Sequence, residues 1–128
     1  GDGTQTRAFS YIADVAPIIA RSIDVLTAHN QVFNVGADTP YTLNDLARAV
    51  ADAMGVKPEI VHVPARNEVK HAYSSHDKCR RIFGESSPTP LQEGLSQMAQ
   101  WAKSVGPRQS RRFDEIEIPR NLPSSWLT

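Results

Sequence analysis

The stretch HVPARNEVKHAYSSHDKCRRIFGE, residues 62–85, says most about the fold of this chain. It begins inside the apolar run PEIVHV, residues 58–63, which predicts a strand. A charged loop with Arg66 and Glu68 follows directly. Ser75 is a candidate N-cap for a short helix that runs through Phe83 and ends at a glycine. A strand, a loop and a helix in this order indicate an α/β chain.

Two further strands are expected before this stretch. Residues 7–12 alternate in character and hold two aromatic side chains, and residues 31–36 have the pattern of a buried strand closed by Gly36. Between them, residues 13–26 repeat apolar side chains at helical spacing, with Pro17 expected in the first turn. Strand, helix and strand therefore alternate from the beginning of the chain.

Residues 42–54 give the clearest helix signal in the sequence. Thr42 is the expected N-cap, Asp45 three residues later completes a capping box, and Gly55 is the expected C-cap. A last helix is predicted at 90–105, and a polar tail with a short strand at 113–118 follows it. The predicted fold class is α/β, a small sheet with flanking helices.

Length and composition fit one ordinary globular domain. The chain has 128 residues, 40% hydrophobic and 22% charged, with zero formal net charge. A nucleic-acid-binding protein usually has a basic excess, and no apolar run approaches the length of a membrane span, so neither partner is expected. The single cysteine, Cys79, excludes a disulfide framework within the chain and predicts a reducing, cytoplasmic location. The chain begins without Met, which we interpret as a piece cut from a longer protein.

No self-contained active site is evident. Gly1 and Gly3 begin like a dinucleotide-binding loop, but no strand precedes them and the third glycine is missing, so they indicate a turn. His76 and Cys79 have a spacing that could face a metal, although a packing role for Cys79 fits the sequence better. No G-x-S-x-G, Walker A or H-E-x-x-H motif occurs. We predict no catalytic residue and no metal site.

The charged residues leave two interpretations open. Arg7 opens the first predicted strand, and Arg66 follows another, so both could point into one cleft and hold a diphosphate through forked hydrogen bonds. Glu68 could accept hydrogen bonds from ribose or sugar hydroxyls. The simpler interpretation is a solvated loop with a surface ion pair. Lys78, Arg80 and Arg81 are expected on a solvated helix face.

Five stretches in register resemble a known family. GDGTQTRAFSYIADVA, VFNVG, RNEV, YSSHDK and LQEGL are similar to the motifs in the C-terminal part of extended short-chain dehydrogenases/reductases, the NAD-dependent nucleotide-sugar epimerases and dehydratases. UDP-glucose 4-epimerase is the best-known member. The resemblance covers about residues 1–105. It implies the C-terminal fragment of a Rossmann-type enzyme, with residues 1–106 as the nucleotide-sugar-binding domain and 107–128 as a tail.

The resemblance also implies what this chain lacks. Family members hold NAD and a Tyr-x-x-x-Lys catalytic pair in an N-terminal Rossmann domain. Here Tyr11, Tyr41 and Tyr73 are followed four residues on by Val, Asp and Asp, never by Lys. We therefore expect NAD in the parent enzyme, no cofactor bound by this chain alone, and a nucleoside-diphosphate sugar together with the missing Rossmann domain as partners.

Position by position, the resemblance assigns four substrate-binding residues. Arg7 and Arg66 match the two family arginines that contact diphosphate, Glu68 matches the acidic residue that binds ribose, and Asn34 lies at the strand end beside the nucleotide pocket. Ala8 stands where the family has Asp, and RNEV is one residue shorter than the family motif. The alternative is therefore a non-catalytic module that binds a nucleotide or a protein partner.

The expected helix at 13–26 adds a prediction about association. In the family this helix packs on the Rossmann half, so Ile18, Ile19 and Ile23 would lose their cover in the isolated piece. An uncovered apolar face is adhesive, and we expect a homo-oligomer formed through residues 13–26.

Overall fold

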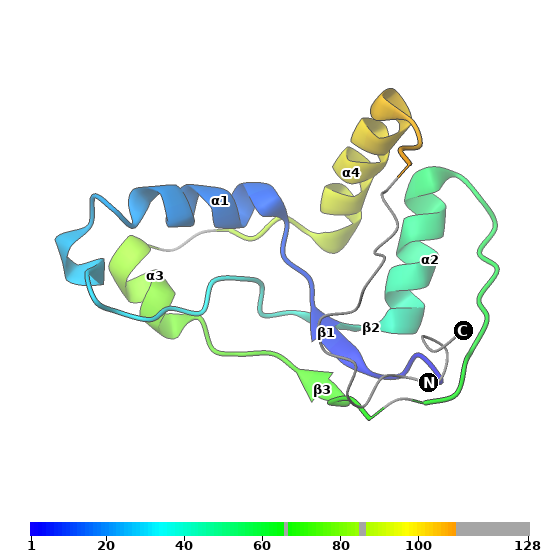
Figure 1. Cartoon of the computed structure of the whole chain (residues 1–128), viewed down its shortest axis with the longest axis horizontal. Helices are drawn as coiled ribbons and strands as arrows, with labels where there is room; N and C mark the ends of the chain where they lie inside the picture. Colours follow the sequence, from blue (N-terminus) through cyan, green and yellow to red (C-terminus); the bar gives the residue numbers. More distant parts are fainter. Residues whose placement is uncertain (66, 85–86, 110–128) are drawn as a thin grey trace.

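A computed structural model describes residues 1–65, 67–84 and 87–109. Its sheet has three short strands in the order β2-β1-β3. The central strand β1, Thr6–Ala8, pairs antiparallel with β2, Pro40–Thr42, and parallel with β3, His71–Ala72. Helices flank this mixed sheet (Figure 1), which confirms the predicted fold class.

Three of the helices follow the sequence closely. They are α2, Leu43–Met54, α3, Asp77–Phe83, and α4, Leu91–Val105. Thr42 caps α2 as predicted: its hydroxyl accepts from the Asp45 amide at 3.0 Å, and the Asp45 carboxylate accepts from the Thr42 amide at 3.3 Å. Gly55 ends α2 with a φ of 73°, the left-handed conformation that glycine adopts without steric cost.

The first helix is shorter than predicted. α1 spans Ile12–Arg21, and a separate 3₁₀ turn, η1, covers Leu26–Ala28. Pro17 lies inside α1, past the first turn where we expected it. At the end of the helix the amide of Ser22 donates to the carbonyls of both Ile18 and Ile19, and a turn follows. The prediction of one helix over 13–26 was therefore wrong at its C-terminal end.

The predicted strands are mostly wrong. The first, at 7–12, is reduced to β1, because the chain leaves the sheet after Ala8 and α1 begins at Ile12. Residues 31–36 and 58–63 are not strands, since no neighbouring segment of the described chain pairs with them. An alternating apolar pattern determines which side chains face inward. A strand also needs a neighbouring segment whose backbone groups form hydrogen bonds with its own. The tail strand predicted at 113–118 lies outside the described residues.

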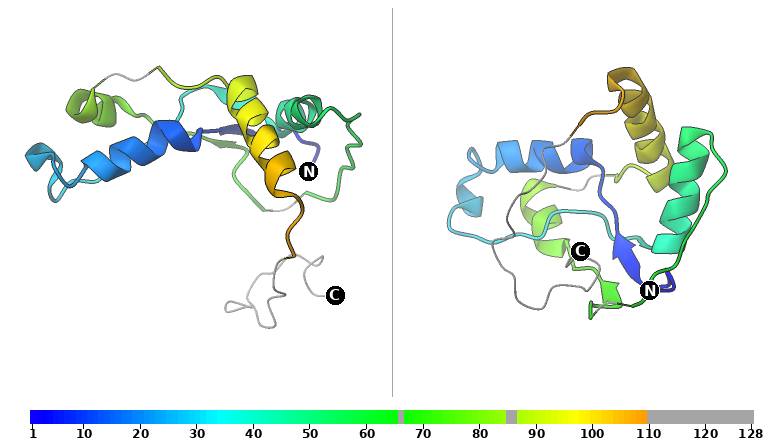
Figure 2. Two further views of the ribbon diagram at one scale, coloured as in Figure 1. Left: turned by 90° about the horizontal axis from the view of Figure 1, so that it is seen from above. Right: turned by 45° about the vertical axis from the view of Figure 1, so that its right-hand side comes forward.

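The core is small and divided. Ala28, Cys79 and Phe83 form one buried cluster, against which partly buried side chains of α1 and of residues 33–35 pack. The Phe33 and Phe83 rings meet edge to face with centroids 5.3 Å apart. α2 and α4 make a second contact away from this cluster (Figure 2), where Ala51 and Ala99 are buried. No helix in the described part of the chain is both long and apolar enough to cross a membrane.

Candidate functional site

Arg7 lies in the middle of the sheet and holds the loop before β3. One guanidinium nitrogen donates to the carbonyl oxygens of Thr6 at 2.8 Å and Lys70 at 3.3 Å, and the other donates to that of Val69 at 2.8 Å. The second nitrogen also lies 3.5 Å from a Glu68 carboxylate oxygen. The side chains of Arg7 and Glu68 are 27% and 41% exposed, so water reaches the pair. The structure thus brings together two of the four predicted substrate-binding residues, as an ion pair.

An open groove lies beside this pair. Its volume is about 650 Å³, and its lining comes from the N-terminal residues Gly1, Asp2, Thr4 and Gln5, from His62, Val63 and Ala65, and from residues 68–70. Glu68 and Lys70 bring a carboxylate and an ammonium group to it. His62, which also lines the groove, contacts the side-chain oxygen of Asn44 at 3.2 Å. Arg66 lies outside the described residues, so its predicted place beside Arg7 stays a prediction.

Asn34 lies apart from the groove, near the start of α3. Its amide nitrogen donates to the carbonyl oxygen of Ser75 at 3.4 Å, a long hydrogen bond. Ser75, the predicted cap of α3, accepts from the Asp77 amide at 3.3 Å, while His76 occupies the N-cap position. Asn34 therefore tethers residues 31–36 to the segment that leads into α3.

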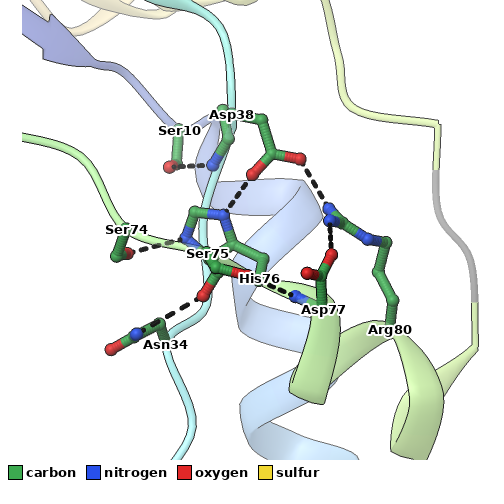
Figure 3. Close-up of polar contacts among 9 residues, drawn as sticks. Ser10, Asn34, Asp38, Ser74, Ser75, His76, Asp77 and Arg80 are labelled. Atoms are coloured by element: carbon green, nitrogen blue, oxygen red, sulfur yellow. Dashed lines mark hydrogen bonds and ion pairs between the residues drawn. The ribbon is translucent and has the colours of Figure 1, made fainter.

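A second polar cluster surrounds His76 (Figure 3). His76 is buried, and its Nδ1 lies 2.5 Å from a carboxylate oxygen of Asp38. Its Nε2 lies 3.3 Å from the Ser74 hydroxyl. Arg80 donates to the other oxygen of Asp38 and also to Asp77. The cluster fastens the loop around Asp38 to the first turn of α3.

These contacts lower the pKa of two carboxyl groups. The hydrogen bond from His76, followed by that from Arg80, lowers the pKa of Asp38 below its ordinary value. Arg80, and to a lesser degree Ser75, lowers the pKa of Asp77. Burial raises the pKa of the Cys79 thiol. A carboxylate held ionised and a thiol held neutral favour a structural role for this cluster over nucleophilic chemistry.

Gly36 is needed where this cluster approaches the chain. A Cβ added at Gly36 would lie 2.8 Å from the Ser10 hydroxyl and 3.2 Å from His76 Nε2. The Ser10 hydroxyl accepts from the amide of Ala37 at 2.9 Å. A cavity of about 270 Å³ lies alongside, lined by Asp38, His76 and Arg80 together with apolar side chains. Gly36, which the sequence placed at the end of a strand, therefore allows Ser10 and His76 to approach the backbone closely.

Sequence reasoning missed this cluster. Arg80 was expected on a solvated face, but it binds two carboxylates, one of them 42 residues away. Lys78 is also engaged: it donates to the Gln31 side chain and to the Val32 carbonyl, and lies 4.8 Å from the centre of the Phe33 ring. Asp77 and Arg80 are three residues apart on one helix, and this spacing could have predicted their ion pair. Nothing in the sequence linked either residue to Asp38.

Comparisons with known proteins agree with this fold. No protein-family model matches the chain. A Methanocaldococcus jannaschii protein provisionally named as a UDP-glucose 4-epimerase is 29% identical over 105 residues, which cover 81% of this chain and 33% of that protein. The UDP-glucose 4-epimerase of Thermotoga maritima, solved with UDP-glucose, is 26% identical with a TM-score of 0.68, covering 82% of this chain and 34% of its own. MoeE5, solved with UDP-glucose and NAD, is 25% identical with a TM-score of 0.66, covering 82% of this chain and 36% of its own.

The small mixed sheet with flanking helices matches about a third of the fold of Rossmann-type epimerases. The chain is homologous to the C-terminal part of the extended short-chain dehydrogenases/reductases, the NAD-dependent sugar-nucleotide epimerases and dehydratases. It spans about a third of the length of the curated relatives that it matches.

Proposed function

We propose that this chain is the nucleoside-diphosphate-sugar-binding portion of an NAD-dependent sugar-nucleotide epimerase or dehydratase. The observation that carries the proposal is the match in both sequence and fold to enzymes whose structures hold UDP-glucose. The NAD-binding part and the Tyr-x-x-x-Lys pair would come from an N-terminal Rossmann domain, because no tyrosine here has lysine four residues later. NAD then belongs to the parent enzyme, and this chain alone is expected to be inactive.

The four substrate-binding residues keep their proposed roles. Arg7 and Arg66 would bind the diphosphate, Glu68 the ribose, and Asn34 would line the nucleotide pocket. In the structure Arg7 is engaged with Glu68 and three carbonyl groups, so it would have to exchange the carboxylate for a phosphate on binding. Both are anions, and a guanidinium fork accommodates either with the same geometry.

A second function has one observation in its favour. The donors of Arg7 are already used to order residues 68–70, as they would be in a module that has lost its nucleotide. The alternative is a non-catalytic module that binds a nucleotide or a protein partner, and this observation favours the protein partner. A cytoplasmic location and the boundary at residue 106 stay predictions under both functions.

Titration calorimetry separates the two functions. We expect UDP, dTDP or GDP to release heat with the chain, and Arg66→Ala to abolish that heat, because one of the two diphosphate cations is removed. Arg81→Ala is the control, since Arg81 is an exposed arginine on α3. Binding that survives Arg66→Ala would remove Arg66 from the site. No heat with any nucleotide would favour the non-catalytic module.

A further inference from the structure

Asn44, in the first turn of α2, joins two of the segments that line the groove. Its side-chain nitrogen donates to the backbone carbonyl of Asp2 at 2.9 Å, and its side-chain oxygen lies 3.2 Å from His62 Nε2. Asp2 belongs to the N-terminal part of the groove lining, and His62 belongs to the segment that precedes Arg66. One side chain of α2 therefore holds both segments in place.

Gly3 allows α2 to come this close to the beginning of the chain. Its carbonyl accepts from the Asn44 amide at 3.1 Å, and its φ is 76°, a left-handed conformation that other residues rarely adopt. A Cβ added at Gly3 would collide with the Asn44 side chain. The glycine turn at the start of the chain is therefore shaped to receive Asn44.

The hydrogen bonds of Asn44 determine which nitrogen of His62 carries the proton. A backbone carbonyl can only accept, so the side-chain nitrogen of Asn44 must face Asp2 and its oxygen must face the ring. That oxygen can also only accept, so the hydrogen is on Nε2. In the neutral ring, Nδ1 is then an acceptor. His62 is exposed in the groove, and no other hydrogen bond to its ring occurs in the described part of the chain.

Lys70 brings a hydrogen-bond donor to the same groove. Its ammonium group has N–H donors and no acceptor. It lies near Asp2: the amide and hydroxyl of Thr4 lower the pKa of Asp2 most, and the charge of Lys70 lowers it further. The ammonium and the His62 ring are therefore both neighbours of the contact between Asp2 and Asn44. A donor near an acceptor matches a ligand in which a carbonyl oxygen adjoins a ring N–H.

The groove extends the proposed nucleotide contacts in the order of the parts of a nucleotide. Arg7 would bind the diphosphate and Glu68 the ribose. Glu68 lies 3.5 Å from Arg7 and also lines the groove. A nucleotide that runs from Arg7 past Glu68 then places its base in the groove, together with His62. The volume of about 650 Å³ is in the usual range for small-molecule sites.

We propose that His62 Nδ1 accepts a hydrogen bond from a ring N–H of the nucleobase, that Lys70 donates to the adjacent carbonyl, and that Asn44 is the positioning residue for His62. This inference rests on the proposed function and names the bases that its site takes. Uracil, thymine and guanine carry a carbonyl next to a ring N–H. Cytosine and adenine have no ring N–H, so the groove selects against their nucleotides.

Titration calorimetry with UDP, dTDP, GDP, CDP and ADP tests the choice of base. We expect one of the first three to bind most tightly. The same nucleotide with its ring N–H replaced by N–CH₃ should bind about fivefold more weakly, because one hydrogen bond is lost. His62→Phe should bind the two forms equally, since it keeps a planar ring and has no acceptor. His29→Phe is the matched control and should keep the preference, because His29 lies in the hollow beside α1 and not in the groove.

Two variants of Asn44 separate positioning of the ring from simple support of the loop. Asn44→Leu and Asn44→Asp both lose the hydrogen bond to Asp2, but only the aspartate keeps an oxygen that accepts from His62 Nε2. At about pH 8, above the ordinary titration range of histidine, we expect Asn44→Asp to keep the preference for the unmethylated nucleotide and Asn44→Leu to lose it. An equal preference in the two variants would remove the positioning role.

NMR of the labelled ring nitrogens reads the tautomer of His62 without any nucleotide. We expect the hydrogen on Nε2. A hydrogen on Nδ1 would overturn the inference and leave the proposed function standing. The same holds if the original chain binds the methylated and unmethylated nucleotides equally, or binds CDP or ADP most tightly. No binding of any nucleotide would count against the proposed function and this inference together.

Discussion

At the residue scale, Asp38 has the most consequential contacts. It accepts from buried His76 and from Arg80, and these bonds lower its pKa. We expect Asp38→Ala to lower the free energy of unfolding at pH 7 by about 1–3 kcal/mol, because the buried ring nitrogen loses its partner. Urea unfolding followed by circular dichroism measures this. Asp24→Ala, the same change at an exposed aspartate, is the control.

The pKa of Asp38 fixes the pH dependence of that loss. Since its folded-state pKa is below the ordinary value of 3.8, its contribution is fully present above pH 3.8 and disappears as pH falls through the lowered pKa. Other aspartates are shifted too, so the informative quantity is the difference between the original chain and Asp38→Ala. That difference should shrink as the pH falls below about 3.8 and through the lowered pKa. A difference that stays constant over this range would contradict the role given to the ionised carboxylate.

Residue-scale prediction from sequence succeeded where the signal was local. Thr42, Asp45 and Gly55 act within one turn of their own helix, and each was assigned correctly. The Asp38–His76 contact spans 38 residues, and its partners become neighbours only after the loop folds onto α3. The same limit applies to Arg7, whose position on β1 was predicted but whose ion pair with Glu68 was not.

At the element scale, the capping box of α2 is the clearest test. Thr42 satisfies the Asp45 amide at the start of the helix and also sits in β2. We expect Thr42→Ala to cost about 1 kcal/mol of stability, and Thr42→Ser to restore most of it because serine keeps the hydroxyl. The urea midpoint should fall for Thr42→Ala with its slope unchanged. Equal stability of the alanine and serine variants would show that the cap contributes nothing.

Helices were predicted better than strands, because the hydrogen bonds of a helix join residues close together in the sequence. α2 and α4 close their bonds within one segment, so periodicity and capping residues sufficed. Residues 31–36 and 58–63 have strand composition, but their pairing depends on segments that composition does not reveal. The prediction for residues 31–36 was right about which side chains face the core, since Phe33 and Val35 pack there. It was wrong only about the hydrogen bonds to a neighbouring strand.

At the scale of the whole molecule, α1 divides its apolar side chains between two environments. Ile18 packs on the core cluster, whereas its neighbour Ile19 is 60% exposed. Among the described residues, exposed large hydrophobic side chains outnumber the buried ones, which is unusual for an independent domain. Under the proposed function, the N-terminal part of the parent enzyme would cover this outward face.

The pair of isoleucines tests that view with a single type of change. Ile18→Ala should lower the free energy of unfolding by about 2 kcal/mol, because it removes packing against the core cluster. Ile19→Ala should change it by less than about 0.5 kcal/mol, as surface substitutions usually do, and should reduce the binding of the dye ANS to the folded chain. Urea unfolding and ANS fluorescence measure the two effects separately. If Ile19→Ala destabilised the chain as much as Ile18→Ala, the outward face would already be packed within this chain. The exposed isoleucines would then no longer support a covering domain.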